Sequence, residues 1–149
     1  MLDKNFKEFI GLLNKNRVRY LVVGGYALAV HGHPRYTKDI DIWILVSPDN
    51  ASSIVITINE FGFSELGLTK EDFLKRGNVI QLGYPPNRID ILTSATGVDF
   101  EECYSKKVQI EMEGVRVDVI DAHNLKRNKK QTGRLQDLAD VQKLEGIKS

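Results

Sequence analysis

The amino-acid sequence predicts an α/β (α+β) fold in which helices pack on a mixed β-sheet. Short runs rich in β-branched residues alternate with segments whose apolar residues recur at helical spacing, and four of these runs form two pairs around turns. The composition, with 42% hydrophobic and 28% charged residues, is that of a globular protein. We expect residues 1–149 to form a single domain whose C-terminal segment, about 121–146, is helical.

The first half of the chain is expected to alternate helix and strand. Its expected elements are a helix over 2–16, a strand over 19–23, a short helix over 26–32, a loop over 33–37, a strand over 38–46 and a helix over 48–61. Apolar residues at helical spacing predict the first helix, and compact β-rich runs predict the strands. Ser47 suits the cap of the last helix and Pro48 its first position.

The second half is expected to contain two antiparallel strand pairs and then helices. Its expected elements are a short helix over 69–76, strands over 78–83 and 88–93 around a turn at 84–87, a hairpin over 105–120 that turns near Glu113 and Gly114, and two C-terminal helices broken at Gly133. Proline, asparagine and glycine favour such turns because they readily adopt the backbone angles of a chain reversal.

Asp39 and Asp41 interrupt a strand that is otherwise apolar. Side chains alternate across a strand, so the two aspartates share one face while Ile40 and Ile42 share the other and enter the core. Two carboxylates on one face repel each other, and we expect something positive to compensate them. The strand is therefore predicted to be half core and half functional site.

Asp90 has the same setting, because Ile89 and Ile91 flank it. If its strand lies beside the strand of Asp39 and Asp41, three carboxylates converge at one edge of the sheet. Carboxylate oxygens are hard ligands that suit Mg²⁺ or Mn²⁺. Two such ions would neutralise the acids and clamp an in-line phosphoryl displacement.

Gly24 and Gly25 stand between the first predicted strand and the following helix. Glycine lets the backbone approach a ligand closely, and amides at a helix N-terminus attract phosphate oxygens. The chain contains no Gly-x-x-x-x-Gly-Lys-Ser/Thr motif, and no Gly-x-Gly-x-x-Gly fingerprint follows the first strand. The glycine pair therefore predicts phosphate binding of another kind, next to the carboxylates.

The order and spacing of these groups resemble the nucleotidyltransferase superfamily that includes DNA polymerase beta and the CCA-adding enzymes. The matching motifs are Val23-Gly24-Gly25, Asp39-Ile40-Asp41-Ile42 and Ile89-Asp90-Ile91. Over roughly 18–145, the segments GGYALAVHGHPRYTKDIDI and LKRNKKQTGRLQDLADV also resemble small bacterial nucleotidyltransferases related to abortive-infection toxins. The resemblance implies a nucleotidyltransferase fold and transfer of a nucleoside monophosphate from an NTP, such as ATP, to a hydroxyl of RNA or protein.

The resemblance also implies a role for each matching residue. It makes Asp39 and Asp41 ligands of both Mg²⁺ or Mn²⁺ ions, and Asp90 a third ligand and the base. The residues that it assigns to the nucleotide are Gly24, Gly25, Tyr26, Lys129 and Asp137. Tyr26 stands where the family usually carries serine. The family order favours Asp90 over Asp118, which β-branched residues also flank and which otherwise reads as a strand-end acid near a helix cap.

Other polar side chains allow two interpretations. Arg35 and Thr37 lie in the loop before the aspartates, where they either contact the triphosphate and brace the motif or belong to an ordinary surface loop. Trp43 is two residues after Asp41 and therefore points to the same face of the predicted strand. It either borders the nucleotide base or is a half-buried aromatic residue. The pair His31 and His33 lacks further zinc ligands, so a helix-ending loop is the favoured interpretation.

The overall charge and the single cysteine exclude several classes of function. A net charge of +1 disfavours a generally basic nucleic-acid coat, although five basic residues in 125–134 form a local run that RNA could contact. The one cysteine, Cys103, allows no internal disulfide, and we expect it in the core. No stretch has the apolar length of a membrane span or a secretory signal, which predicts a cytoplasmic protein.

Two functions remain open from the sequence. The first is the metal-dependent transferase, for which the resemblance suggests a role in a toxin–antitoxin pair. The alternative is a non-catalytic module of the same fold that binds nucleotide or metal and acts as a regulatory or partner-binding protein, which Tyr26 favours. The expected partners are an NTP, an RNA or protein acceptor, and either an antitoxin-like protein or a second copy of the chain.

Overall fold

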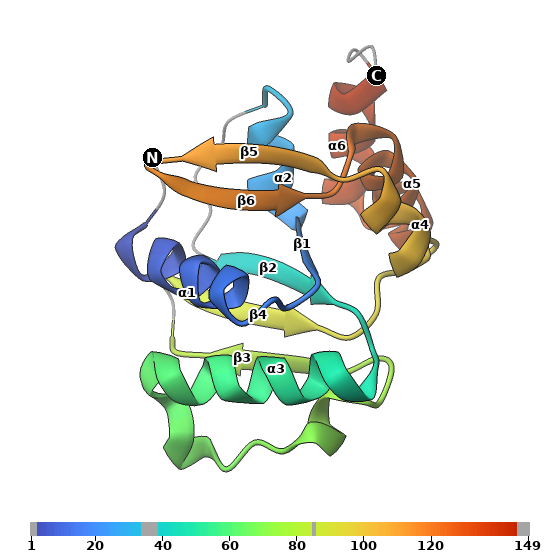
Figure 1. Cartoon of the computed structure of the whole chain (residues 1–149). Coiled ribbons are helices and arrows are strands. Elements are labelled where there is room, and N and C mark those ends of the chain that lie inside the picture. The colour runs from blue at the N-terminus through green and yellow to red at the C-terminus, as the bar shows by residue number, and fades with distance from the viewer. Residues whose placement is uncertain (1–2, 34–38, 85, 146–149) are drawn as a thin grey trace.

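A six-stranded mixed β-sheet forms the centre of the computed structural model (Figure 1). The structure describes residues 3–33, 39–84 and 86–145. The strands are β1 (Tyr20–Val23), β2 (Asp39–Ile44), β3 (Val79–Leu82), β4 (Arg88–Leu92), β5 (Val108–Met112) and β6 (Val115–Val119), in the order β3-β4-β2-β1-β6-β5. β2 and β4 are parallel, as are β1 and β6, whereas the other neighbours are antiparallel. The predicted fold class is confirmed.

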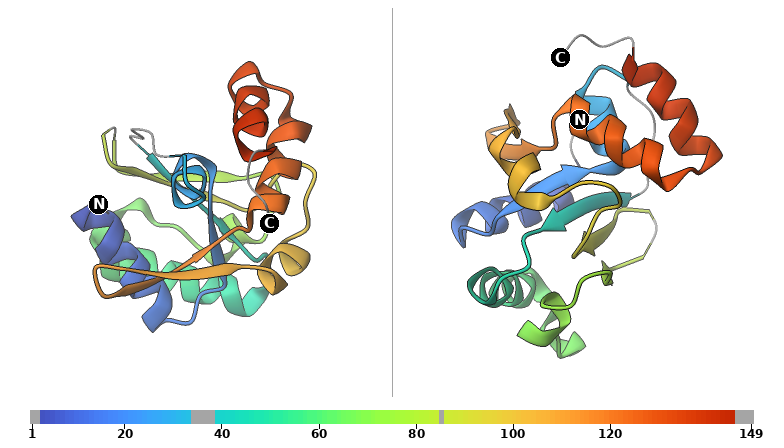
Figure 2. Two further views of the ribbon diagram at one scale, coloured as in Figure 1. Left: turned by 90° about the horizontal axis from the view of Figure 1, so that it is seen from above. Right: turned by 90° about the vertical axis from the view of Figure 1, so that its right-hand side faces the viewer.

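Helices cover both faces of this sheet (Figure 2). They are α1 (Lys4–Lys15), α2 (Gly24–Val30), α3 (Pro48–Ile58), α4 (Phe100–Ser105), α5 (Ala122–Thr132) and α6 (Leu135–Glu145). α1 and α3 lie on one face, while α2 packs with α5 on the other and α6 follows α5. No described helix combines the length and the apolar character that a bilayer crossing requires.

The capping predicted for α3 is confirmed, and α1 has a cap of its own. The Ser47 hydroxyl accepts a hydrogen bond from the Asn50 amide at 3.2 Å, and Pro48 opens α3. Asp3 precedes α1 and accepts hydrogen bonds from the first amides of that helix. Both caps satisfy amides that have no partner inside their helix.

The hydrophobic core follows the alternation of the central strands. Ile40, Ile42 and Ile44 of β2 are buried, and so are Ile89 and Ile91 of β4. In the two strands these side chains share the face opposite the aspartates, where the apolar sides of α1 and α3 cover them. Each such burial is worth about 1.5–3 kcal/mol. The face that holds the aspartates is thereby left for polar groups.

Several predicted boundaries differ from the structure. α2 begins at Gly24 and not at residue 26, because the glycine pair itself forms the first turn. The helix expected over 48–61 ends at Ile58, followed by a π-helical turn, Asn59–Phe63, in which Gly62 has φ 106°. The helix expected over 69–76 is only a 3₁₀ turn, Lys70–Phe73.

One helix, α4, was not predicted, because six residues are too few for a helical apolar period to stand out. Asp99 caps it by accepting a hydrogen bond from the Glu102 amide. The two turns placed from glycine are confirmed. Glu113 and Gly114 both have positive φ between β5 and β6, and Gly133 ends α5 in the left-handed conformation.

Candidate active site

The register of two parallel strands brings the predicted carboxylates together. β2 and β4 are paired so that Asp41 lies directly beside Asp90, and Asp39 lies beside Arg88. Residues at matching positions of neighbouring strands point to the same face, so Asp39, Asp41 and Asp90 all project from one side of the sheet. The condition on which the site prediction depended, that the strand of Asp90 adjoins that of Asp41, is confirmed.

Arg88 is the cation that compensates two of these carboxylates. Its Nε donates to Asp90 Oδ1 at 2.7 Å, and its Nη2 donates to Asp90 Oδ2 at 3.0 Å and to Asp39 Oδ2 at 2.8 Å. The two-pronged contact with Asp90 matches the planar guanidinium to a carboxylate. A compensating positive charge is predicted from the sequence, whereas its identity as Arg88 follows only from the structure. The signal available in the sequence was that Arg88 and Asp90 are two residues apart on one strand, so that their side chains point to the same face.

Asp41 is the carboxylate whose charge is least favourable. Its pKa is raised from 3.8 to about 6. Burial is the largest cause of this rise, and the negative charges of Asp90 and Asp39 also contribute to it. The positive charges of Lys129 and Arg88 act in the opposite direction and lower the pKa. A shifted pKa that has a specific charge partner is typical of functional sites.

Gly24 makes room for this carboxylate. It starts α2 with φ 68°, and a Cβ placed there would collide with Asp41 Oδ2. In β1 the preceding residue, Val23, lies opposite Asp41 across the antiparallel pair. Glycine is therefore required at this position both by the backbone conformation and by the close approach of the carboxylate.

Gly24→Ala is expected to lower the free energy of unfolding by about 2 kcal/mol or more, because alanine at positive φ is strained and its methyl group displaces Asp41. Chemical denaturation would measure the change. Gly11→Ala is the matched control: Gly11 lies inside α1 with open space around its Cα, so the variant should gain up to about 1 kcal/mol. Equal behaviour of the two variants would contradict this explanation of Gly24.

The three carboxylates have the chemistry that Mg²⁺ or Mn²⁺ requires. All their donors are hard oxygens, and Asp39 Oδ1 is buried without a hydrogen-bond partner among the described residues. A buried carboxylate oxygen without a hydrogen-bond partner destabilises the folded state unless a cation binds to it. Within the described residues, however, no three acidic, histidine or cysteine side chains are already arranged to hold an ion. Arg88 lies between two of the acids.

A cavity of about 180 Å³ opens beside Gly24 and Asp41. Its other side is formed by the C-terminal helices and the turn between them, including Lys129, Thr132 and Arg134. The glycine, a carboxylate and the C-terminal residues implied by the resemblance thus line one space. The C-terminal segment reaches the site through the packing of α5 against α2.

Lys129 and Asp137 line this cavity but pair with each other. Lys129 is only 4% exposed, and its Nζ lies 3.2 Å from Asp137 Oδ1 and 2.8 Å from Asp140 Oδ2. Burial opposes ionisation of Asp137, but hydrogen bonds from Thr132 and Arg134 and the charge of Lys129 outweigh it and lower its pKa. The network joins α5 to α6, a role that is not evident from the sequence pattern.

The remaining predicted nucleotide-binding residues either lie outside the described part of the chain or belong to α2. Arg35 and Thr37 lie outside the described residues. Gly25 is the second residue of α2. The ring of Tyr26 packs edge-to-face against Phe6 of α1, with ring centres 5.4 Å apart, so its body belongs to the helix packing.

Three other side chains are placed by their packing. Trp43 is buried and meets Phe100 of α4 edge-to-face at 5.0 Å, so it is more enclosed than the half-buried residue expected. Asp118 lies in β6, which β1 separates from β2, and accepts a hydrogen bond from Gln109. It is the second-last residue of β6, three positions before Asp121, which caps α5, so it is the strand-end acid near a helix cap that was expected.

His31 and Cys103 also follow the structural interpretations. His31 Nε2 lies 2.8 Å from the carbonyl oxygen of Ile120, which ties the end of α2 to the end of β6. Cys103 is fully buried in the core, as expected, and burial raises the pKa of its thiol to about 12. A thiol with that pKa is unreactive at neutral pH.

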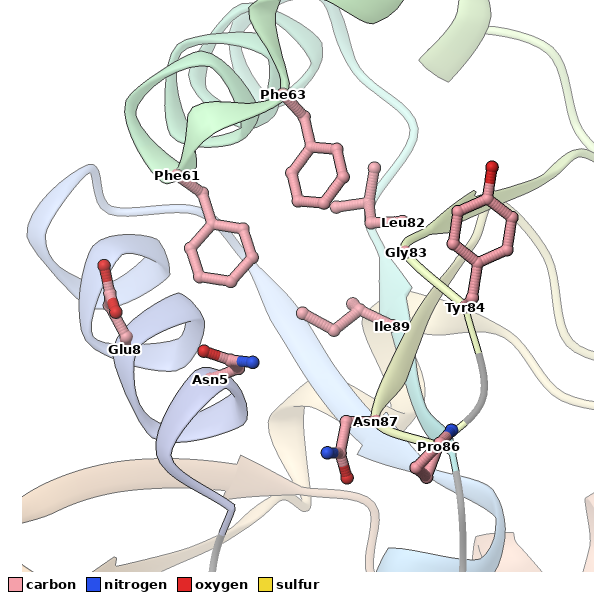
Figure 3. Close-up of a pocket in the computed structure, with 10 residues that line it drawn as sticks. All are labelled: Asn5, Glu8, Phe61, Phe63, Leu82, Gly83, Tyr84, Pro86, Asn87 and Ile89. Carbon is pink, nitrogen blue, oxygen red and sulfur yellow. The ribbon is translucent and has the colours of Figure 1, made fainter.

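A larger cavity, of about 340 Å³, lies away from the carboxylates (Figure 3). Phe61 and Phe63 point into it above a floor of Leu82 and Ile89. Among the described residues, its lining contains one acidic residue, Glu8, and no basic residue. It therefore has neither the metal-binding nor the phosphate-binding chemistry of the smaller cavity.

The structure resembles two solved structures. A candidate nucleotidyltransferase from Thermotoga maritima matches with a TM-score of 0.61 at 17% identity, over 94% of this chain and 89% of the other. An antigenic nucleotidyltransferase-like protein from Paracoccidioides brasiliensis matches with a TM-score of 0.54 at 12% identity, over 96% and 77%. The chain has a nucleotidyltransferase fold. No protein-family model and no curated protein matches the sequence.

Sequence identity to these structures is low, so the likeness concerns the fold. Within this fold, the parallel pair β2–β4 sets Asp41 beside Asp90. What the site does depends on the chemistry of its own residues.

Proposed function

We propose that the chain is a metal-dependent nucleotidyltransferase that transfers a nucleoside monophosphate from an NTP to a hydroxyl of RNA or protein. The observation that supports this most strongly is the pairing of Asp41 with Asp90, with Asp39 on the same face, beside the backbone of Gly24. Converging carboxylates next to a closely approached glycine are the parts that phosphoryl transfer needs.

Each residue has a proposed part in the reaction. Two Mg²⁺ or Mn²⁺ ions, when bound, would supply positive charge to the transferring phosphate and the acceptor hydroxyl. Asp39, Asp41 and Asp90 would hold the ions, with Asp90 also accepting the proton of the hydroxyl. Gly24 and Gly25 would face the triphosphate in the adjoining cavity, to which Arg134 adds a basic side chain. The main contributions of the chain are positioning and charge stabilisation.

A second function is favoured by Arg88. Its guanidinium already bridges Asp39 and Asp90, as it would in a protein that uses this fold without turnover. The alternative is thus a nucleotide- or metal-binding module that acts as a regulatory or partner-binding protein. The two functions differ in a measurable way, because only the transferase releases pyrophosphate.

The test is incubation of the protein with each labelled NTP, Mg²⁺ or Mn²⁺, and total cell RNA and protein. We expect label to appear in an RNA or protein acceptor and to require the divalent ion. Binding of NTP by calorimetry without labelling or pyrophosphate release would select the binding module. Absence of both binding and labelling would contradict both functions.

The narrower family assignment is part of the same proposal. The resemblance to nucleotidyltransferases related to abortive-infection toxins suggests a toxin–antitoxin component, neutralised by an antitoxin-like protein or regulated through a homodimer. Growth arrest on expression, lost when Asp41 is replaced by asparagine, would support this role. Unimpaired growth of cells that contain the active transferase would contradict it.

A further inference from the structure

Arg88 competes for the oxygens that a metal ion would use. It donates to three of the four carboxylate oxygens of Asp39 and Asp90, and the fourth, Asp39 Oδ1, is the buried oxygen without a partner. The Arg88 side chain is 22% exposed and that of Asp90 is 10% exposed, so water screens these contacts only in part. A divalent ion and the guanidinium therefore cannot both have full access to the same carboxylates.

Charge explains why an arginine occupies this position. Three aspartates on one face carry a charge of −3 when ionised, and Arg88 reduces it to −2. Bound ions would leave no need for that compensation and would repel the guanidinium at close range. Arg88 is thus favourable without metal and unfavourable with it.

We propose that Arg88 is an internal counter-cation that holds the acidic site closed to metal until it releases Asp39, Asp90 or both. Metal binding is then coupled to a movement of one side chain, and the affinity for metal is lower than the carboxylates alone would provide. This inference rests on the proposed function, because it takes the three carboxylates as the metal ligands.

The chain provides a matched pair of arginines for the test. Arg88 precedes Asp90 by two residues in β4, and Arg116 precedes the buried Asp118 by two residues in β6, with its Nε 3.6 Å from that carboxylate. Both are Arg-x-Asp motifs on strands, but Asp118 lies away from the proposed site. Arg88→Gln tests the inference and Arg116→Gln controls for loss of a strand arginine.

Mn²⁺ binding by calorimetry and the melting temperature in the presence of a chelator would be measured for each variant. Arg88→Gln is expected to bind Mn²⁺ at least about tenfold more tightly than the wild type and to melt about 3–8 °C lower without metal. Arg116→Gln should leave Mn²⁺ affinity unchanged. Unchanged or weaker Mn²⁺ binding by Arg88→Gln would overturn the inference and leave the proposed function intact.

The other outcomes are also decisive. If only Arg88→Gln binds Mn²⁺, the inference is supported and the binding-module function is favoured over the transferase. If no variant binds it, both the inference and the proposed function fail.

A second measurement uses the wild type, in case the variant does not fold. The Nε–H NMR signal of Arg88 is expected to shift when Mg²⁺ saturates the protein, whereas that of Arg116 should not. A static Arg88 signal at saturation would overturn the inference.

Discussion

Asp41→Asn is expected to lower metal-dependent labelling from NTP by at least about 10²–10³-fold, because it removes one ionised ligand from the centre of the acidic face. The amide has nearly the shape of the carboxylate, so packing around Gly24 is retained. Asp118→Asn is the matched control, since Asp118 is also a strand aspartate, is buried, and belongs to β6. Equal loss in both variants, or retained labelling in Asp41→Asn, would contradict the assignment of the site.

The pH dependence of stability tests the state of Asp41 independently of activity. The pKa of Asp41 is raised to about 6 in the folded protein from 3.8, so the folded state binds its proton more tightly than the unfolded chain. The wild type should therefore lose stability relative to Asp41→Asn as pH rises from about 4 to about 6, by at most about 3 kcal/mol. Denaturation of both proteins at pH 4 and pH 8 measures this difference. A stability difference between the two proteins that is the same at pH 4 and pH 8 would contradict it.

Lys129→Met is expected to destabilise the protein by about 3–5 kcal/mol, because it leaves Asp137 and Asp140 buried without their shared cation. Chemical denaturation, together with helical circular dichroism, would show the loss of α6 from the folded structure. Addition of Asp140→Asn to this variant should recover part of the stability, because one buried charge is removed.

The control for Lys129 is its neighbour. Lys130 lies on the same helix with an exposed side chain, so Lys130→Met should change stability by less than about 0.5 kcal/mol. The resemblance assigns Lys129 to the nucleotide, and that role predicts a different result. A Lys129→Met variant of unchanged stability that binds NTP more weakly would favour contact with the triphosphate over the structural role.

Local patterns in the sequence were sufficient to predict the strands and most of the helices. The alternation in β2 separates Ile40 and Ile42 from Asp39 and Asp41, which predicted both the buried face and the acidic face. Turn residues such as Gly133 predicted where elements end. These features depend on neighbours within a few positions, so a single chain reveals them.

Ion pairs between residues far apart in the chain could not be predicted from such local patterns. Arg88 and Asp39 are 49 positions apart, and their ion pair exists only because β4 adds in parallel beside β2 in one register. Lys129 illustrates the same point. The resemblance assigns it to the nucleotide, but the packing of α6 against α5 encloses it between two aspartates.

The sequence by itself determined the strands, most of the helices and the acids that project from one face, because alternation and turn chemistry are local. The tertiary structure alone decided which charges face one another. Strand register set Arg88 between Asp39 and Asp90, and the packing of α6 against α5 buried Lys129 between Asp137 and Asp140. Charge compensation acts through space over a few ångströms, so it follows from packing and not from distance along the chain.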